Sequence, residues 1–204
     1  AGIAGFGRVE KVVGTDVNPR ALELSAMTAG LNGLDIDLRN GSLFEPVDGE
    51  KFDLICTNPP FVVSPPDGDR LVYRETGFAG DDVVRQIVSG ASAHLNDGGW
   101  CQLLAAWIHE DEQPWQERLA SWIDPTGLDA WVVQRERVDL AEYAEMWLAD
   151  SGRWHENDHF ERYDRWLSWF AESKIEAMGF GWITLRKAVR DVPQVRIEEW
   201  TAPV

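Results

Sequence analysis

The chain has 204 residues, of which 44% are hydrophobic and 26% are charged, the mixture of a globular protein that buries one core. Its formal net charge of −16 argues against a surface that binds phosphate backbones without selectivity. No apolar run approaches the roughly 18 residues that a membrane-spanning helix needs, and the first ten residues lack the order of a secretory signal. We therefore expect a cytoplasmic protein that makes no membrane contact.

Short apolar runs and amphipathic segments alternate along the first two thirds of the chain. Strands are expected over 11–16, 36–38, 52–57, 100–108 and 128–133, and helices after Asn18–Pro19, after Asp81 and over 114–123. This alternation is typical of a mostly parallel α/β sheet wound with helices on both faces. The strand over 100–108 is therefore expected to be buried on both faces.

Two helices have predicted inward faces. In the first helix these residues are Ala21, Leu24, Met27 and Leu31, and in the second they are Val84, Ile87, Val88, Ala91 and Leu95. The two cysteines, Cys56 and Cys101, stand alone in apolar stretches without CxxC spacing, so buried reduced thiols are expected.

A helical insertion is expected over residues 139–178. One apolar stripe comprises Leu140, Tyr143, Ala144 and Trp147, and a second comprises Phe160, Tyr163, Leu167, Phe170 and Lys174, with Trp166 and Trp169 beside it. Strands follow over 180–186 and 195–197. The Trp-rich insertion could be core, or it could form a lid over a substrate. The long loop over 62–80 could also contact a substrate, through Arg70, Tyr73 and Arg74.

The residues that follow the strand 52–57 carry the chemistry. The strand runs directly into Asn58, Pro59, Pro60 and Phe61, at the carboxyl edge where open α/β sheets bind ligands. The prolines fix φ and have no N–H, so carbonyls of this turn can face a ligand. Asn58 adds a side-chain amide and Phe61 a flat apolar face, which together suit a planar group that bears an NH₂. The same four residues could instead form only a rigid turn.

On these residues the chain resembles the class I S-adenosylmethionine-dependent N-methyltransferases that carry an Asn-Pro-Pro-aromatic motif. That group includes base-amino methyltransferases of RNA and DNA and the release-factor glutamine methyltransferases. The resemblance runs from about Val12 to Ile108, and residues 179–186 are similar to the family's late antiparallel strand. It implies a Rossmann-like sheet, S-adenosylmethionine as cofactor and methyl transfer to a nitrogen.

The resemblance also implies cofactor-binding residues. Asp16 ends a strand where the family's acid accepts hydrogen bonds from both ribose hydroxyls, with Val17 beside it. Ser42 and Leu43 lie where the family lines the adenine pocket, although many relatives carry an acid in place of Ser42. Asn58 would lie next to the cofactor as well as hold the substrate. Asp16 could instead belong to a dinucleotide-binding dehydrogenase, but no G-x-G-x-x-G precedes it.

The beginning of the chain departs from the family. Gly2, Gly5 and Gly7 resemble the remnant of its glycine-rich cofactor loop. Only eight residues separate Gly7 from Asp16, too few for the helix of several turns and the strand that the family places there. We therefore expect residues 1–204 to form a single methyltransferase domain that is incomplete at its N-terminus, a fragment of a longer chain that by itself binds the cofactor weakly or not at all.

No metal and no covalent nucleophile are expected, because an activated methyl donor mainly requires that nitrogen, methyl and sulfur be held in line. Residues 155–159 formally match the zinc motif H-E-x-x-H. However, Asn157 and Asp158 favour the start of a helix rather than its interior, which predicts a solvated helix N-terminus.

The substrate is less well specified. Phe61 favours an exocyclic amine of a nucleobase, in RNA more than in DNA, because extruded bases stack on aromatic side chains. The charge of −16 favours instead a glutamine in a protein of the release-factor type. Of the two, the nucleobase amine is narrowly preferred, because a domain upstream of these residues could supply a basic surface, whereas an enzyme with a protein substrate would gain less from Phe61. A third interpretation is a non-catalytic binding module with a degenerate methyltransferase fold.

Overall fold

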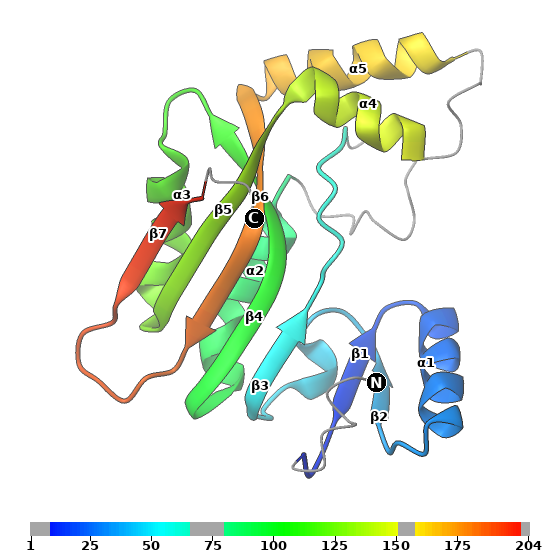
Figure 1. The fold of residues 1–204 in the computed structure, drawn as a ribbon, viewed down its shortest axis with the longest axis vertical. Helices are drawn as coiled ribbons and strands as arrows, with labels where there is room; N and C mark the ends of the chain where they lie inside the picture. Colours follow the sequence, from blue (N-terminus) through cyan, green and yellow to red (C-terminus); the bar gives the residue numbers. More distant parts are fainter. Residues whose placement is uncertain (1–8, 66–79, 151–157, 201–204) are drawn as a thin grey trace. The chain divides into compact units, whose positions relative to one another are not determined.

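The computed structural model describes residues 9–65, 80–150 and 158–200 (Figure 1). By its internal contacts the chain divides into two compact units, residues 1–50 and residues 51–204. Within the described residues, none of the helices is long and apolar enough to cross a membrane.

The first unit is a β-α-β arrangement. Strand β1 (Val13–Asp16) leads into helix α1 (Pro19–Leu31), and strand β2 (Asp37–Asn40) pairs in parallel with β1. The expected helix start is confirmed, because the Asn18 side chain accepts a hydrogen bond from the backbone N–H of Arg20 at 2.9 Å. A short 3₁₀ turn, η2 (Glu45–Val47), follows β2.

The inward face predicted for α1 is wrong. Leu24, Met27 and Leu31 are 48%, 61% and 87% exposed, and Ala29 is the one buried residue of this helix. Apolar residues recur around α1 at several angles, so their spacing does not single out the face that packs on β1 and β2.

The second unit is built on a five-stranded sheet in the order β3-β4-β6-β5-β7. Its strands are β3 (Phe52–Thr57), β4 (Leu95–Glu110), β5 (Asp129–Asp139), β6 (Ile175–Arg186) and β7 (Val195–Glu199). Strand β6 is antiparallel to β4 and β5, whereas β3 is parallel to β4 and β7 is parallel to β5. The late antiparallel strand and the mostly parallel α/β sheet are thereby confirmed. This topology also puts the carboxyl ends of β3, β4 and β5 at one edge of the sheet.

One face of this sheet is covered by helices α2 (Asp82–Ala91) and α3 (Trp115–Ile123), which are joined to it by the 3₁₀ turns η3 (Ser92–His94) and η4 (Asp124–Thr126). Four of the inward residues predicted for the second helix, Val84, Ile87, Val88 and Ala91, are buried in α2 as expected, whereas Leu95 is buried but belongs to β4. The burial predicted for β4 on both faces is wrong, because Trp100 and Leu104 on the opposite face are 42% and 50% exposed. Of the cysteines, Cys101 is buried as predicted, whereas Cys56 is exposed.

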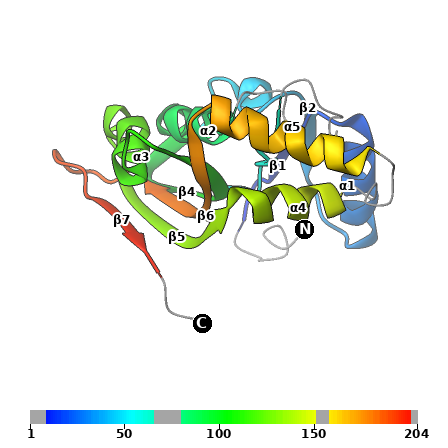
Figure 2. The same cartoon turned by 90° about the horizontal axis from the view of Figure 1, so that it is seen from above.

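Helices α4 (Leu140–Asp150) and α5 (His159–Glu172) lie side by side beyond the edge where β5 ends and β6 begins (Figure 2). Tyr143 and Ala144 of α4 are buried as expected, whereas Phe160 of α5 is 79% exposed and wrongly predicted to face inward. The buried face of α5 comprises Arg162, Trp166 and Phe170. Helix α5 begins at His159 with Asp158 as its N-cap, and His155, the first histidine of the zinc-like motif, lies outside the described residues.

Candidate functional site: two strand ends

The four residues after β3 alternate in exposure. Asn58 and Pro60 are exposed, Pro59 is buried and Phe61 is half-buried. Thr57 is still paired with Leu103 of β4, so Asn58 is the first residue beyond the sheet. The side chain of Asn58 is therefore exposed to solvent, whereas the residue that follows it, Pro59, is buried.

The ring of Phe61 lies among aromatic side chains of the two elements that reach this edge. It packs edge-on against Trp147 of α4, at a centroid distance of 6.4 Å, and against Phe180 of β6, at 6.1 Å. Edge-on packing of this kind fixes the tilt of a ring as well as its position. Phe61 is thus held by α4 and the late strand β6.

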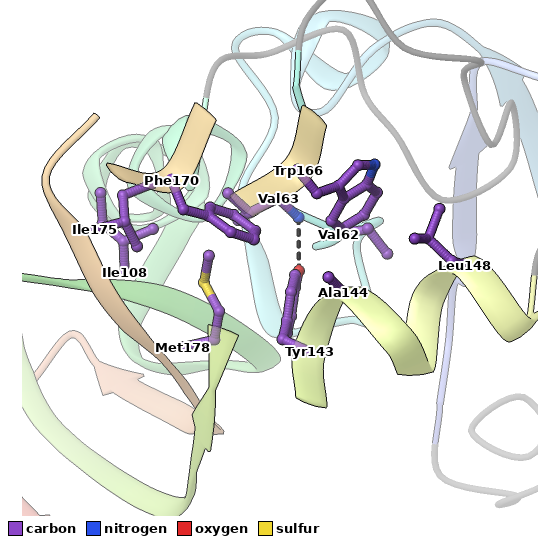
Figure 3. Packing of buried hydrophobic residues seen from close by; sticks show 10 residues of the cluster. All are labelled: Val62, Val63, Ile108, Tyr143, Ala144, Leu148, Trp166, Phe170, Ile175 and Met178. Carbon is purple, nitrogen blue, oxygen red and sulfur yellow. Dashed lines mark hydrogen bonds between the residues drawn. The ribbon is translucent and has the colours of Figure 1, made fainter. Parts of the chain in front are cut away.

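The chain then enters the core. Val62 and Val63 are buried in a cluster with residues of α4, α5, β4 and β6 (Figure 3). The backbone N–H of Val63 donates a hydrogen bond to the hydroxyl of Tyr143 at 2.8 Å, drawn as a dashed line in Figure 3. The stripe at 140–147 contains Tyr143, but nothing in the sequence indicates that its hydroxyl reaches the segment after the motif.

A buried carboxylate lies at the same edge. Asp81, just before α2, forms an ion pair with Arg118 of α3 at 2.7 Å and accepts a hydrogen bond from the backbone N–H of Ile108 at 3.0 Å. Burial raises the pKa of the Asp81 carboxyl, and the charge of Arg118 opposes this shift. Asp81 ties α2, α3 and the end of β4 together, which is a structural role.

In the first unit the predicted cofactor residues gather at the carboxyl ends of β1 and β2. Asp16 lies opposite Asn40 in the strand register, and its carboxylate accepts a hydrogen bond from the backbone N–H of Asn18 at 2.7 Å. The Asn40 side-chain amide donates to the carbonyls of Asp16 and Val17, both at 3.1 Å. Asn40 is a residue that sequence reasoning missed; its place at the end of a strand was the available signal.

Ser42 and Leu43 follow directly in the turn after β2. The backbone N–H of Ser42 donates to the Glu45 carboxylate at 3.3 Å, and the carbonyl of Leu43 accepts from the hydroxyl of Thr15 at 3.4 Å. Leu43 has φ of +47°, in the left-handed region that side chains other than glycine seldom adopt. The structure thus brings Asp16, Val17, Ser42 and Leu43 to one end of the same two strands.

The other predicted residues fall in two groups. Asn58 to Phe61 belong to the second unit and are contiguous there. Gly2 and Gly5, as well as Arg70, Tyr73 and Arg74, lie outside the described residues. In the described ranges, no three histidine, cysteine, aspartate or glutamate side chains are grouped so that they could hold a metal ion.

Comparison with known proteins decides the family. Residues 3–120 match the model of the methyltransferase small domain. The chain belongs to this family. It is 37% identical over 106 residues to a release factor glutamine methyltransferase of Xylella fastidiosa, covering 48% of this chain and 38% of that protein.

Two further relatives differ in what their names say they methylate. A ribosomal protein uL3 glutamine methyltransferase of Bradyrhizobium diazoefficiens is 39% identical over 95 residues, which cover 41% of this chain and 30% of that protein. Ribosomal RNA small subunit methyltransferase C of Haemophilus influenzae is 34% identical over 91 residues, covering 45% and 24%. The chain therefore spans between about a quarter and two fifths of the length of these curated relatives.

Membership of this family indicates S-adenosylmethionine as the cofactor. The first unit fits such a group on two counts. The half-exposed Asp16 carboxylate uses one oxygen for the Asn18 N–H, and within the described residues its other oxygen has no partner, which suits a pair of ribose hydroxyls. Val17 beside it is 65% exposed, so its apolar side chain would be available to a bound cofactor.

Proposed function

We propose that this protein transfers a methyl group from S-adenosylmethionine to the side-chain amide nitrogen of a glutamine in a protein substrate. The observation that carries the proposal is the exposed Asn58 amide at the end of β3, on a segment whose next residues, Pro59 to Val63, are largely buried. A rigidly held amide can accept and donate hydrogen bonds to a second amide in a fixed orientation.

In the proposed reaction Asn58 and the Pro59 carbonyl accept the two N–H groups of the substrate amide. These bonds turn the nitrogen lone pair toward the methyl group, which the cofactor supplies in an activated, sulfonium-bound form. A nitrogen–carbon bond forms as the carbon–sulfur bond breaks, the bonding pair stays on sulfur, and one proton leaves the nitrogen for water. The residues thereby orient the amide, and no acid or base of the protein is required.

Charge supports a protein substrate. The chain carries a net charge of −16, and exposed carboxylates line the helical pair next to the motif. They are Glu142 and Glu145 of α4 and Glu161, Asp164 and Glu172 of α5. Such a surface repels a phosphate backbone and attracts a basic protein segment. Two relatives named as glutamine methyltransferases support the same substrate class.

A nucleobase amine is the second candidate, and Phe61 is the observation that favours it. Its ring is half-buried, so part of it could stack on an extruded base. One relative named as a ribosomal RNA methyltransferase supports this substrate. The sequence alone favours the nucleobase narrowly, whereas the exposed carboxylates of α4 and α5 favour glutamine.

The test has two steps on the full-length protein. Calorimetry first measures binding of S-adenosylmethionine, with Asp16→Asn as the variant expected to weaken it. Radiolabelled methyl transfer then compares purified release factor with bulk RNA. Label in the release factor supports the proposal, and label in RNA alone selects the nucleobase. Cofactor binding without label in either substrate contradicts both, and absence of cofactor binding selects the non-catalytic binding module.

A further inference from the structure

The segment that follows β3 is fixed at both ends. At its beginning, Thr57 is paired with Leu103 in the β3–β4 ladder. At its end, the N–H of Val63 donates to the hydroxyl of Tyr143 at 2.8 Å, and Val63 is only 1% exposed. The chain between these points includes Pro59 and Pro60, whose rings lock φ and leave few soft dihedrals. A bond at Val63 therefore constrains the backbone as far back as Asn58.

Tyr143 is also connected to the motif through side chains. Trp147 and Phe180, the two rings that flank Phe61, both pack on the Tyr143 ring, at centroid distances of 6.1 and 5.9 Å. The Tyr143 side chain is fully buried, and Phe170 of α5 packs edge-on against it at 6.0 Å. One side chain thus contacts both the backbone anchor after Phe61 and the two rings beside Phe61.

The hydroxyl of Tyr143 has a role that the packing of its ring alone does not fill. A phenylalanine would occupy the same volume and keep the ring contacts, but it would leave the buried Val63 N–H without its acceptor. A buried donor without a partner moves toward water or toward another acceptor, and the backbone moves with it. The hydroxyl therefore stabilises one backbone conformation of the segment from Asn58 to Val63.

We propose that Tyr143 is a positioning residue for methyl transfer, and this inference rests on the proposed function. Its hydroxyl acts through the Val63 N–H to hold Asn58 and Phe61 in the orientation that aligns the substrate nitrogen. It touches neither substrate nor cofactor. Displacement of an orienting group by a fraction of an ångström lowers the rate of the chemical step more than it lowers affinity.

The test compares Tyr143→Phe with two matched controls. Tyr163→Phe removes a phenol hydroxyl from a residue packed on the same cluster, and Ile175→Ala destabilises the cluster without removing the acceptor of the Val63 bond. For Tyr143→Phe we expect kcat to fall roughly tenfold with little change in the Kd of S-adenosylmethionine, and the Val63 amide to exchange its hydrogen at least about tenfold faster. Both controls, assayed well below their unfolding midpoints, should keep kcat within about twofold.

Different outcomes contradict different steps. An active wild type with an unchanged kcat for Tyr143→Phe would overturn the positioning role. A Val63 amide that exchanges equally fast in wild type and variant would overturn the anchor itself. A wild type that binds the cofactor but methylates neither release factor nor RNA would refute the proposed function and with it the positioning role, while the exchange data would still report the anchor.

Discussion

Polar residues follow the carboxyl ends of strands in both units, but the two ends are stabilised differently. In the first unit the ends of β1 and β2 are held by hydrogen bonds among neighbouring polar groups, chiefly those of Asn18 and Asn40 with Asp16. In the second unit the segment after β3 is held by an aromatic cluster from α4, α5 and β6, with one buried hydrogen bond. Loss of one polar group in the first region should therefore have a local effect, whereas loss of a buried ring in the second should lower the stability of the whole cluster.

The largest expected effect is on the aromatic cluster. Phe170→Ala removes a fully buried ring, and we expect it to lower the free energy of unfolding by about 3–5 kcal/mol in urea titrations. Phe160→Ala is the control on the same helix, because that ring is exposed and its loss should change stability by less than about 0.5 kcal/mol. Equal losses for the two variants would show that α5 is packed through a different face.

In the first unit, substitution of Gly41, where the chain turns after β2, should lower the free energy of unfolding. Gly41 has φ of +152°, and an added Cβ would lie 2.5 Å from Cγ of Pro46. We expect Gly41→Ala to lower the free energy of unfolding by about 1–3 kcal/mol in thermal melts. Gly30→Ala, in α1 with open space around it, should have the opposite sign, because alanine is the better helix former. If Gly41→Ala left the free energy of unfolding unchanged, the conclusion that this turn excludes a side chain at residue 41 would be wrong.

A smaller effect is expected at Asn40, whose amide donates to the carbonyls of Asp16 and Val17. Because these bonds are exposed, Asn40→Ala should lower the free energy of unfolding by only about 1 kcal/mol. Hydrogen exchange should speed up at the amides near Asp16 and stay unchanged at Val63. Faster exchange at Val63 would contradict the local character of the first region.

The second unit should also respond to pH through a buried histidine. Gln134 accepts hydrogen bonds from His109 Nε2 at 2.7 Å and Trp107 Nε1 at 3.1 Å. Burial lowers the pKa of His109 below its ordinary 6.5, so the unfolded chain binds a proton first as the pH falls. Stability from this group is therefore present above pH 6.5 and decreases as the pH falls toward the lower folded pKa. His109→Gln keeps a donor to Gln134 and should flatten this pH dependence in denaturant titrations; an unchanged slope would contradict the assignment.

Predictions from the sequence are most accurate where interactions between residues close in the chain determine the structure. The helix start at Asn18, the strand over 52–57 and the inward face of α2 follow from capping, proline placement and spacing, and the structure confirms all three. The predicted orientation of α1 and the double burial of β4 are wrong because they depend on which tertiary neighbours cover each face.

For the candidate site, the motif after β3 is visible in the sequence because it is contiguous. Its anchor is not, because Tyr143 is 80 residues away from Val63 and reaches it only through the order of the strands. That β5 ends at the same edge as β3 is a consequence of β6 running antiparallel between β4 and β5.

Asn58→Ala tests the central claim most directly. The measurement is kcat for methyl transfer to the substrate that accepts label, at saturating S-adenosylmethionine, with Asn96→Ala as an asparagine control elsewhere in the second unit. Loss of a group that orients the reacting nitrogen should lower kcat roughly 100-fold, with a smaller change in cofactor affinity and a normal unfolding transition. A kcat within about twofold of wild type would contradict the role of Asn58, and with it the proposed function of the segment after β3.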